Sequence, residues 1–305
     1  MTDTNQHSSA PAGAHSAPLA EASIRRLRNL PPLPRTSQAL LQMLSDPDLD
    51  MLTLAETIEQ TPSLAARILG VANSAFFAHA AAVRDVPDAI IRVLGLHLVR
   101  DLSISFALSQ PFELRDCGRF DTKRYWISAM ESAVLAQLLA SRTPAHEGPT
   151  PAEAYLSGLI HNLGLLALIH IAPQAMNQVF ARIQSEPDLN LIQEERRAVG
   201  LDHSAAGAAL ASAWQLPPLL AVAMGAAVEN PPFHQEQILL LILSQCSRIR
   251  QHLTADAGAP DSADMQKGWR ALGLTSDVMP AVIAQFRDRS DEIAELAAVF
   301  LGVGR

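Results

Sequence analysis

Aromatic and charged residues are scarce in this sequence: phenylalanine, tryptophan and tyrosine make up 5% of its 305 residues and charged residues 18%. Hydrophobic residues make up 49%. Aliphatic side chains and alanine must therefore fill the core, and such side chains suit closely packed helices. No stretch sustains the alternation of apolar and polar residues that a half-buried strand needs. The composition predicts an all-α protein with a sizeable core.

Cysteine is scarce as well, since only Cys117 and Cys246 occur and they lie far apart. No zinc motif and no disulfide framework can be built from them, which indicates a reducing compartment. Residues 1–19 lack the apolar centre of a signal peptide. No apolar run reaches the ~18 residues of a membrane span, and the longest candidate is 216–228. We therefore expect a cytoplasmic protein that does not enter a membrane.

The formal net charge is −8, so the surface repels phosphate backbones and nucleic-acid binding is not expected. The phosphate-binding patterns G-x-x-x-x-G-K-[ST] and G-x-G-x-x-G are absent, and so is the G-x-S-x-G turn that carries a nucleophilic serine. These absences leave no independent case for a hydrolase or a transferase.

Capping residues predict where several helices begin. Thr53 and Glu56 fit a capping box, and Asp88 can cap the next helix. Residues 151–171 form one long apolar pattern that predicts a single helix, and residues 276–301 predict another, amphipathic one.

The most informative motif is the segment 158–164, which reads Gly-Leu-Ile-His-Asn-Leu-Gly. A histidine followed directly by aspartate, on an apolar helix just before glycine, is the core of the HD metal-dependent phosphohydrolase signature. Here the second position is Asn162. A neutral amide is a much poorer ligand for a hydrolytic cation than a carboxylate, so the motif predicts a scaffold without its chemistry.

An ordered series of motifs resembles the HDOD domain, a helical relative of the HD phosphohydrolases. The series comprises Leu30-Pro31-Pro32-Leu33-Pro34, Asp46-Pro47-Asp48, Asn73-Ser74, Gly95, Trp126, His161-Asn162 with Gly164, Asp202-His203, Gly207, Trp214 and Leu216-Pro217. The resemblance implies an HD-like multi-helix bundle with an N-terminal helical lobe.

The resemblance also divides the chain. We expect a disordered tail over 1–19 and an HDOD domain over 20–235, with an N-terminal lobe at about 20–110 and a degenerate HD-like lobe at 120–235. Residues 236–305 are then a C-terminal helical extension packed on the domain.

The metal-ligand positions that the resemblance implies are mostly lost. The early histidine position matches Ser128, the His-Asp pair is His161-Asn162, and the downstream paired histidines fall where Ala227 and Val228 stand. At most one ligand remains, whereas hydrolytic sites need three or more protein ligands or a bridged pair. We therefore expect no metal, no cofactor and no catalytic residue.

Two interpretations of His161 and Asn162 stay open. Either the pair is a relic that still binds something small, or it is buried and each residue satisfies the other or a backbone carbonyl, because an unpaired buried polar group costs roughly 1–3 kcal/mol. The second interpretation predicts that Asn162→Asp destabilises the fold without creating activity.

The other motif residues also have a structural and a functional interpretation. Asn73 and Ser74 end a helix, where asparagine is among the few residues besides glycine that tolerate the left-handed conformation, or they contact a ligand. Asp202 caps a helix that begins at His203, or the two form an acid–base or ligand pair. Trp214 is a core anchor or a stacking ring.

Function is expected to follow the family: a bacterial, non-catalytic signal-transduction scaffold that binds other signalling proteins. The alternatives are a divergent metal-dependent phosphohydrolase and a nucleotide-sensing module in the vacated cleft. The C-terminal helix is a candidate surface for a partner or a homodimer, or it packs on its own domain. Its apolar stripe comprises Val278, Val282, Ile283, Phe286, Ile293, Leu296 and Val299.

Overall fold

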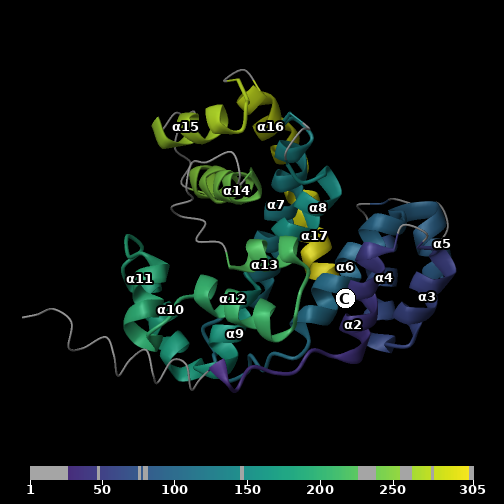
Figure 1. Ribbon diagram of the computed structural model, residues 1–305, viewed down its shortest axis with the longest axis horizontal. Coiled ribbons are helices and arrows are strands. Elements are labelled where there is room, and N and C mark those ends of the chain that lie inside the picture. The colour runs from purple at the N-terminus through teal and green to yellow at the C-terminus, as the bar shows by residue number, and fades with distance from the viewer. Residues whose placement is uncertain are drawn as a thin grey trace, which may run out of the picture.

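The computed structural model describes residues 27–46, 49–74, 77, 82–144, 148–225, 238–254, 263–275 and 278–301. Within these ranges every regular element is a helix, and helices from the whole chain pack side by side (Figure 1). The predicted all-α fold is confirmed. The tail predicted over 1–19 lies outside the described residues.

The N-terminal lobe is built from short helices. They are α2 (Arg35–Gln42), η1 (Met43–Ser45), α3 (Met51–Glu59), α4 (Pro62–Ala72), α5 (Val86–Ala89), the π-helical stretch η3 (Ile90–Leu94) and α6 (Leu96–Ser109). Gly95 separates η3 from α6 with a φ of 79°, a conformation that glycine adopts without the steric cost of a Cβ. This glycine lets two helices follow one another directly at an angle.

Two predicted caps in this lobe are wrong by a few residues. The cap of α3 is Asp50, which accepts hydrogen bonds from the backbone of Leu52 and Thr53, so the capping box at Thr53 does not form. The cap of α5 is Asp85, and Asp88 instead pairs with Arg92 one turn further on. In both cases an aspartate a few residues earlier satisfies the free N–H groups of the first turn.

The second lobe begins with the long central helix of the molecule. Its helices are α7 (Thr122–Ala140), α8 (Pro151–Ile160), α9 (Leu163–Ile171), α10 (Pro173–Ser185), α11 (Leu191–Val199), α12 (His203–Ala213) and α13 (Pro218–Met224). Helix α7 packs along α8, while α9 packs on α12. Thr150 and Glu153 form a complete capping box at the start of α8.

The single helix predicted over 151–171 is interrupted. The chain turns at His161 and Asn162, so α8 ends before the turn and α9 begins after it. By length and composition alone the stretch Pro151–Ile171 is apolar enough to cross a membrane, a better candidate than the predicted 216–228. Of its most apolar window of 18 residues, 72% is buried inside the protein, because α8 packs against α7 and α9 against α12.

Four further helices complete the chain: α14 (Ile238–Thr254), α15 (Ala263–Ala271), α16 (Val278–Arg287) and α17 (Ser290–Phe300). The single helix predicted over 276–301 is therefore two, with a break at residues 288–289. Helix α14 packs on α7, and α17 packs on both α7 and α4. In Figure 1, α17 lies between the central helices and the N-terminal lobe.

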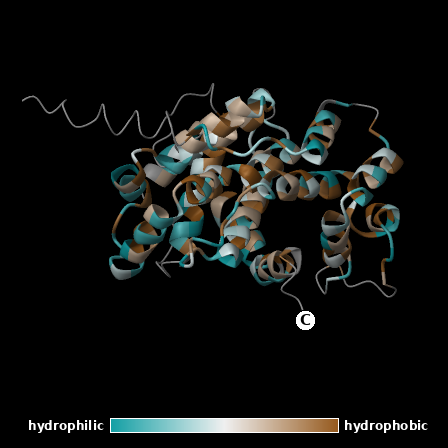
Figure 2. Ribbon diagram, turned by 90° about the horizontal axis from the view of Figure 1, so that it is seen from below, coloured by the Kyte–Doolittle hydropathy of each residue, from teal (hydrophilic) through white to brown (hydrophobic). Residues whose placement is uncertain are grey.

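One continuous hydrophobic core runs through both lobes and the C-terminal helices, from Leu40 to Ala297. Hydrophilic residues gather on the outward faces of the helices (Figure 2). The C-terminal apolar stripe belongs to this core, because Val282, Phe286 and Ile293 are buried. The structure therefore places this stripe against its own domain.

Candidate functional site

His161 is the C-cap residue that directly follows α8, and it is buried, with 7% of its surface exposed. Its ring Nδ1 lies 2.8 Å from the backbone oxygen of Gly158. Burial, with smaller contributions from the charges of Arg250 and His203, lowers the pKa of His161 to about 4. The imidazole is therefore neutral at physiological pH.

Asn162 differs from its neighbour, because it is only half-buried. It occupies the N-cap position of α9, although its side chain makes no capping hydrogen bond. Of the expected buried pair, His161 is buried and lies against a backbone carbonyl as predicted, whereas Asn162 is more exposed than predicted. Ser128 on α7 is also half-buried, and its backbone oxygen accepts a hydrogen bond from Ser132. Ala227 and Val228 lie outside the described residues.

Glu195, which sequence reasoning missed, lies fully buried on α11 next to His203. Its Oε2 accepts the backbone N–H of His203 at 2.9 Å and lies 2.7 Å from the ring Nδ1 of the same residue. No described residue bonds to its Oε1. Asp202 caps α12 as predicted, accepting the Ala205 N–H, and it also binds Arg196 at 2.6 Å.

Arg250 brings a positive charge from α14 to the same region. Its Nε donates to Glu131 at 2.8 Å and its Nη1 to the Ser132 hydroxyl at 3.4 Å. Both partners are on α7, beside the contact with Gly158. A guanidinium carries the kind of charge that a divalent cation brings to an active HD site, and here it lowers the pKa of His161 further.

The glycines of the motif are points of close backbone contact. A Cβ at Gly158 would lie 2.6 Å from the backbone oxygen of Ser132. One at Gly164 would overlap the His203 carbonyl, and one at Gly207 the Met224 carbonyl. Only hydrogen fits at these crossings. The motif therefore holds α8 against α7, α9 against α12 and α12 against α13.

The side chains around His161 do not fit a hydrolytic metal. Among the residues that the structure describes, no three histidine, cysteine, aspartate or glutamate side chains gather at metal-binding spacing. The nearby acids are already engaged, Glu195 by His203 and Glu131 by Arg250. With an amide at position 162 and a guanidinium close by, the donor set lacks the negative charge that such a cation needs.

Asn73 and Trp214 connect segments of the chain that lie apart in the sequence. Asn73 is the C-cap of α4, as predicted, and with a φ of −94° it caps the helix without entering the left-handed conformation. Its side chain exchanges two hydrogen bonds with the backbone of Val83, at 2.8 and 2.9 Å. Buried Ser74 follows it. Trp214 is buried, and its indole N–H donates to Pro31 at 2.8 Å, which joins α12 to the N-terminal segment.

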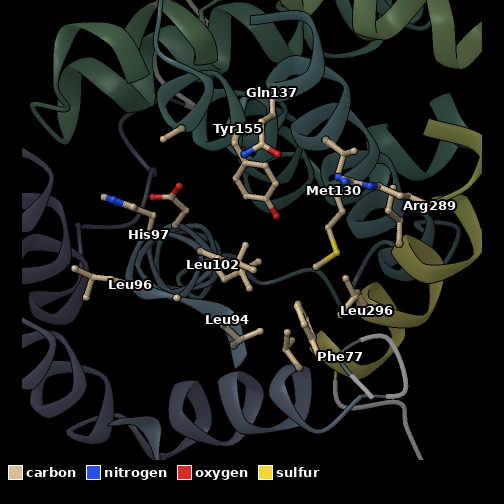
Figure 3. A pocket seen from close by; sticks show the side chains of 17 residues that line it. Phe77, Leu94, Leu96, His97, Leu102, Met130, Gln137, Tyr155, Arg289 and Leu296 are labelled. Carbon is tan, nitrogen blue, oxygen red and sulfur yellow. The ribbon is translucent and has the colours of Figure 1, made fainter. Parts of the chain in front are cut away.

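A cavity of about 360 Å³ lies apart from this cleft, between the N-terminal lobe, α7, α8 and α17. Figure 3 shows Leu94, Leu102, Met130 and Leu296 among its walls, with Tyr155 directed into it. The buried acid Asp101 also lines it. The sequence carried a signal for this second polar site, because Asp101 is a charged residue within the mostly apolar segment 96–109.

Comparisons with known proteins agree with the fold and the motifs. The sequence profile of the HDOD domain matches residues 30–230. These residues are more than half of the chain, and the protein belongs to the HDOD family.

Solved structures resemble the chain over nearly its whole length. A candidate signal-transduction protein from Marinobacter aquaeolei VT8 is 26% identical with a TM-score of 0.78, covering 95% of this chain and 67% of that one. An HDOD domain protein of unknown function from Geobacter sulfurreducens is 22% identical with a TM-score of 0.69, covering 92% and 98%. The second likeness shows the fold alone.

One curated relative is an uncharacterized protein from Treponema pallidum (strain Nichols), 27% identical over 199 residues. The match covers 65% of this chain and 37% of the relative. The chain thus spans well under half the length of that protein.

Proposed function

We propose that this protein is a non-catalytic regulator of HDOD type that acts in signal transduction by binding other signalling proteins in the bacterial cytoplasm. The observation that carries the proposal is the state of the degenerate cleft: Arg250, whose positive charge acts on His161, is ion-paired to Glu131, and Asn162 stands where the HD signature has a carboxylate. The name of the Marinobacter relative, which assigns that protein to signal transduction, supports a regulatory role.

The two histidines and the capping aspartate of the cleft support this proposal because each of the three has a structural partner. His161 is bonded to its own helix, His203 is held by Glu195, and Asp202 caps α12. A catalytic acid or base must instead reach a substrate proton with an adjusted pKa near the working pH. The pKa of His161, at about 4, is too low for it to act as a general acid near neutral pH.

Metal analysis of the purified full chain, paired with a hydrolysis screen against nucleotides and cyclic dinucleotides, tests the absence of catalysis. An active HD phosphohydrolase purified in parallel serves as the positive control. We expect manganese, iron and zinc well below stoichiometric amounts and no turnover. Stoichiometric metal together with turnover that is lost in His161→Gln would overturn the proposal in favour of a divergent phosphohydrolase.

Affinity capture from the native cell tests the regulatory part. The full chain and its His161→Gln variant are used side by side, because a scaffold that works through its surface captures the same signalling proteins with or without this buried imidazole. Capture that disappears in the variant, while its melting temperature is unchanged, would contradict a purely surface-based role.

A further inference from the structure

The cavity between the lobes joins three parts of the chain that are far apart in the sequence. The N-terminal lobe contributes Val71 and Leu102, α7 contributes Met130, and α17 contributes Ile293 and Leu296. Its volume of about 360 Å³ falls in the range of small-molecule sites, which are mostly apolar with a few polar groups that fix orientation. At ~30 Å³ for each water-sized group, it has room for about a dozen such groups.

The polar feature of this cavity is one carboxyl oxygen. Asp101 is 2% exposed, and Arg100 directs both its Nε and its Nη2 to the same oxygen, Oδ1, at 3.0 Å. No described residue donates a hydrogen bond to Oδ2, although Asp101 lines the cavity. This oxygen is open to the cavity, where a carboxylate oxygen surrounded mostly by apolar side chains gains from a hydrogen-bond donor. The position thus offers an acceptor to whatever enters.

The charge around Asp101 limits what can enter. Because Arg100 already balances the carboxylate, a ligand need not be a cation, and an anion would face the unpartnered Oδ2. The rest of the lining is mostly apolar, and its other polar side chains are those of His97, Gln137, Tyr155 and Arg289, which Figure 3 labels. The chemistry that suits this site is an uncharged apolar body with one N–H or O–H donor.

We propose that the cavity between the lobes binds a small, uncharged, mostly apolar molecule of about the size of indole, which donates one hydrogen bond to Asp101. This site is separate from the degenerate cleft, and it goes beyond the role proposed above. Because α17 closes the cavity against both lobes, an occupied cavity ties the C-terminal helix to α4 and α7.

Calorimetric titration of the full chain with indole tests the proposal, and 1-methylindole is the matched ligand without a donor. We expect one binding site per chain for indole and at least about tenfold weaker binding of 1-methylindole, since the Asp101 oxygen then stays unpaired. Equal binding of the two ligands, or no binding of indole, overturns the proposal. Tighter binding of octanoate than of 1-octanol also overturns the proposal, because the cavity would then select an anion through the exposed Arg289 in its lining.

Two variants locate the site. Val134→Phe places a ring in the cavity from α7, and Val222→Phe adds the same ring at a position on α13 that is 46% exposed. We expect indole binding to fall at least about tenfold in the first and to stay unchanged in the second. If Val134→Phe does not fold, Ala152→Leu fills the cavity from α8 instead. Binding that survives both fillings places indole elsewhere and overturns the proposal.

Discussion

The cleft around His161 and the cavity beside Asp101 are both built on α7 and α8, yet the two polar centres are treated differently. In the cleft the charged side chains are paired with one another, with Arg250 held by Glu131 and His203 by Glu195, and among the described residues only Oε1 of that glutamate is left without a donor in these pairs. In the cavity a buried carboxylate keeps one oxygen free beside open apolar space. The comparison teaches that the His-Asn motif and its glycines are engaged in contacts within the protein, while the open space lies at the junction of the lobes.

The largest expected effect comes from the packing of the cleft. Gly164→Ala should lower the free energy of unfolding by about 3 kcal/mol or more, because its Cβ would overlap the backbone of α12 and two packed helices cannot easily move apart. Gly118→Ala is the control, since nothing lies within 4 Å of a Cβ there, and it should change stability by about 0.5 kcal/mol or less. Urea unfolding measures both. If Gly164→Ala changed the free energy of unfolding as little as Gly118→Ala does, the contact between α9 and α12 would be loosely packed.

The two centres should respond to pH with opposite signs. Burial lowers the pKa of His161 from 6.5 to about 4, so below pH 6.5 the unfolded chain takes up a proton that the folded one does not. This lowers the free energy of unfolding by about 3 kcal/mol in total as the pH falls to 4. Burial also raises the pKa of Asp101 from 3.8 to about 6, partly opposed by Arg100. Between these two pKa values Asp101 holds a proton in the folded chain but not in the unfolded one. Its contribution to the free energy of unfolding therefore falls by about 3 kcal/mol as the pH rises from 3.8 to 6.

These opposed slopes nearly cancel in the wild type between pH 4 and 6, and single variants expose them. Asp101→Asn should make stability rise more steeply with pH in this window, and His161→Gln should remove the rise that His161 contributes. Denaturant unfolding at half-unit pH steps measures the slopes, which are compared rather than the absolute stabilities. The idea fails if both variants keep the wild-type slope.

A smaller effect should follow when the cation of the cleft is removed. Arg250→Gln leaves Glu131 without its partner, and for this part-exposed pair we expect a loss of roughly 1 kcal/mol. The pKa of His161 should rise, because a positive charge that lowers it is gone. NMR titration of the His161 ring measures this shift. Arg92→Gln breaks an exposed pair in the other lobe and should leave the His161 titration unchanged.

The smallest effect concerns Asn162→Asp. The sequence alone predicted destabilisation, on the assumption that this residue is buried with His161. Asn162 is instead half-buried at the start of α9, where a carboxylate interacts favourably with the free N–H groups of the helix. We expect a change of about 0.5 kcal/mol or less in thermal unfolding. A large loss of thermal stability in this variant would instead indicate that Asn162 is buried with His161 and shielded from water.

Sequence reasoning predicted several helix ends from local signals, although the caps of α3 and α5 are aspartates that lie a few residues before the predicted ones. Asp202 caps α12 because a side-chain oxygen reaches an N–H three residues away. Gly95 and the Pro151 start of α8 follow from backbone geometry in the same way. Reasoning of this kind failed at 151–171 and 276–301, where the apolar pattern continues through a break. The pattern reports which residues are buried, but it does not report where two helices must change direction to pack on different neighbours.

The sequence by itself determined the all-α class, the HDOD motifs and the missing carboxylate at position 162, since each depends on residue type or on spacing within one helix. Only the tertiary structure decided that Arg250 meets Glu131 across 119 positions, that Glu195 lies buried beneath His203, and that Asp101 faces open space beside α17. Helical periodicity specifies that a face is covered, but which helix covers it is set by how the whole set of side chains fills a common core.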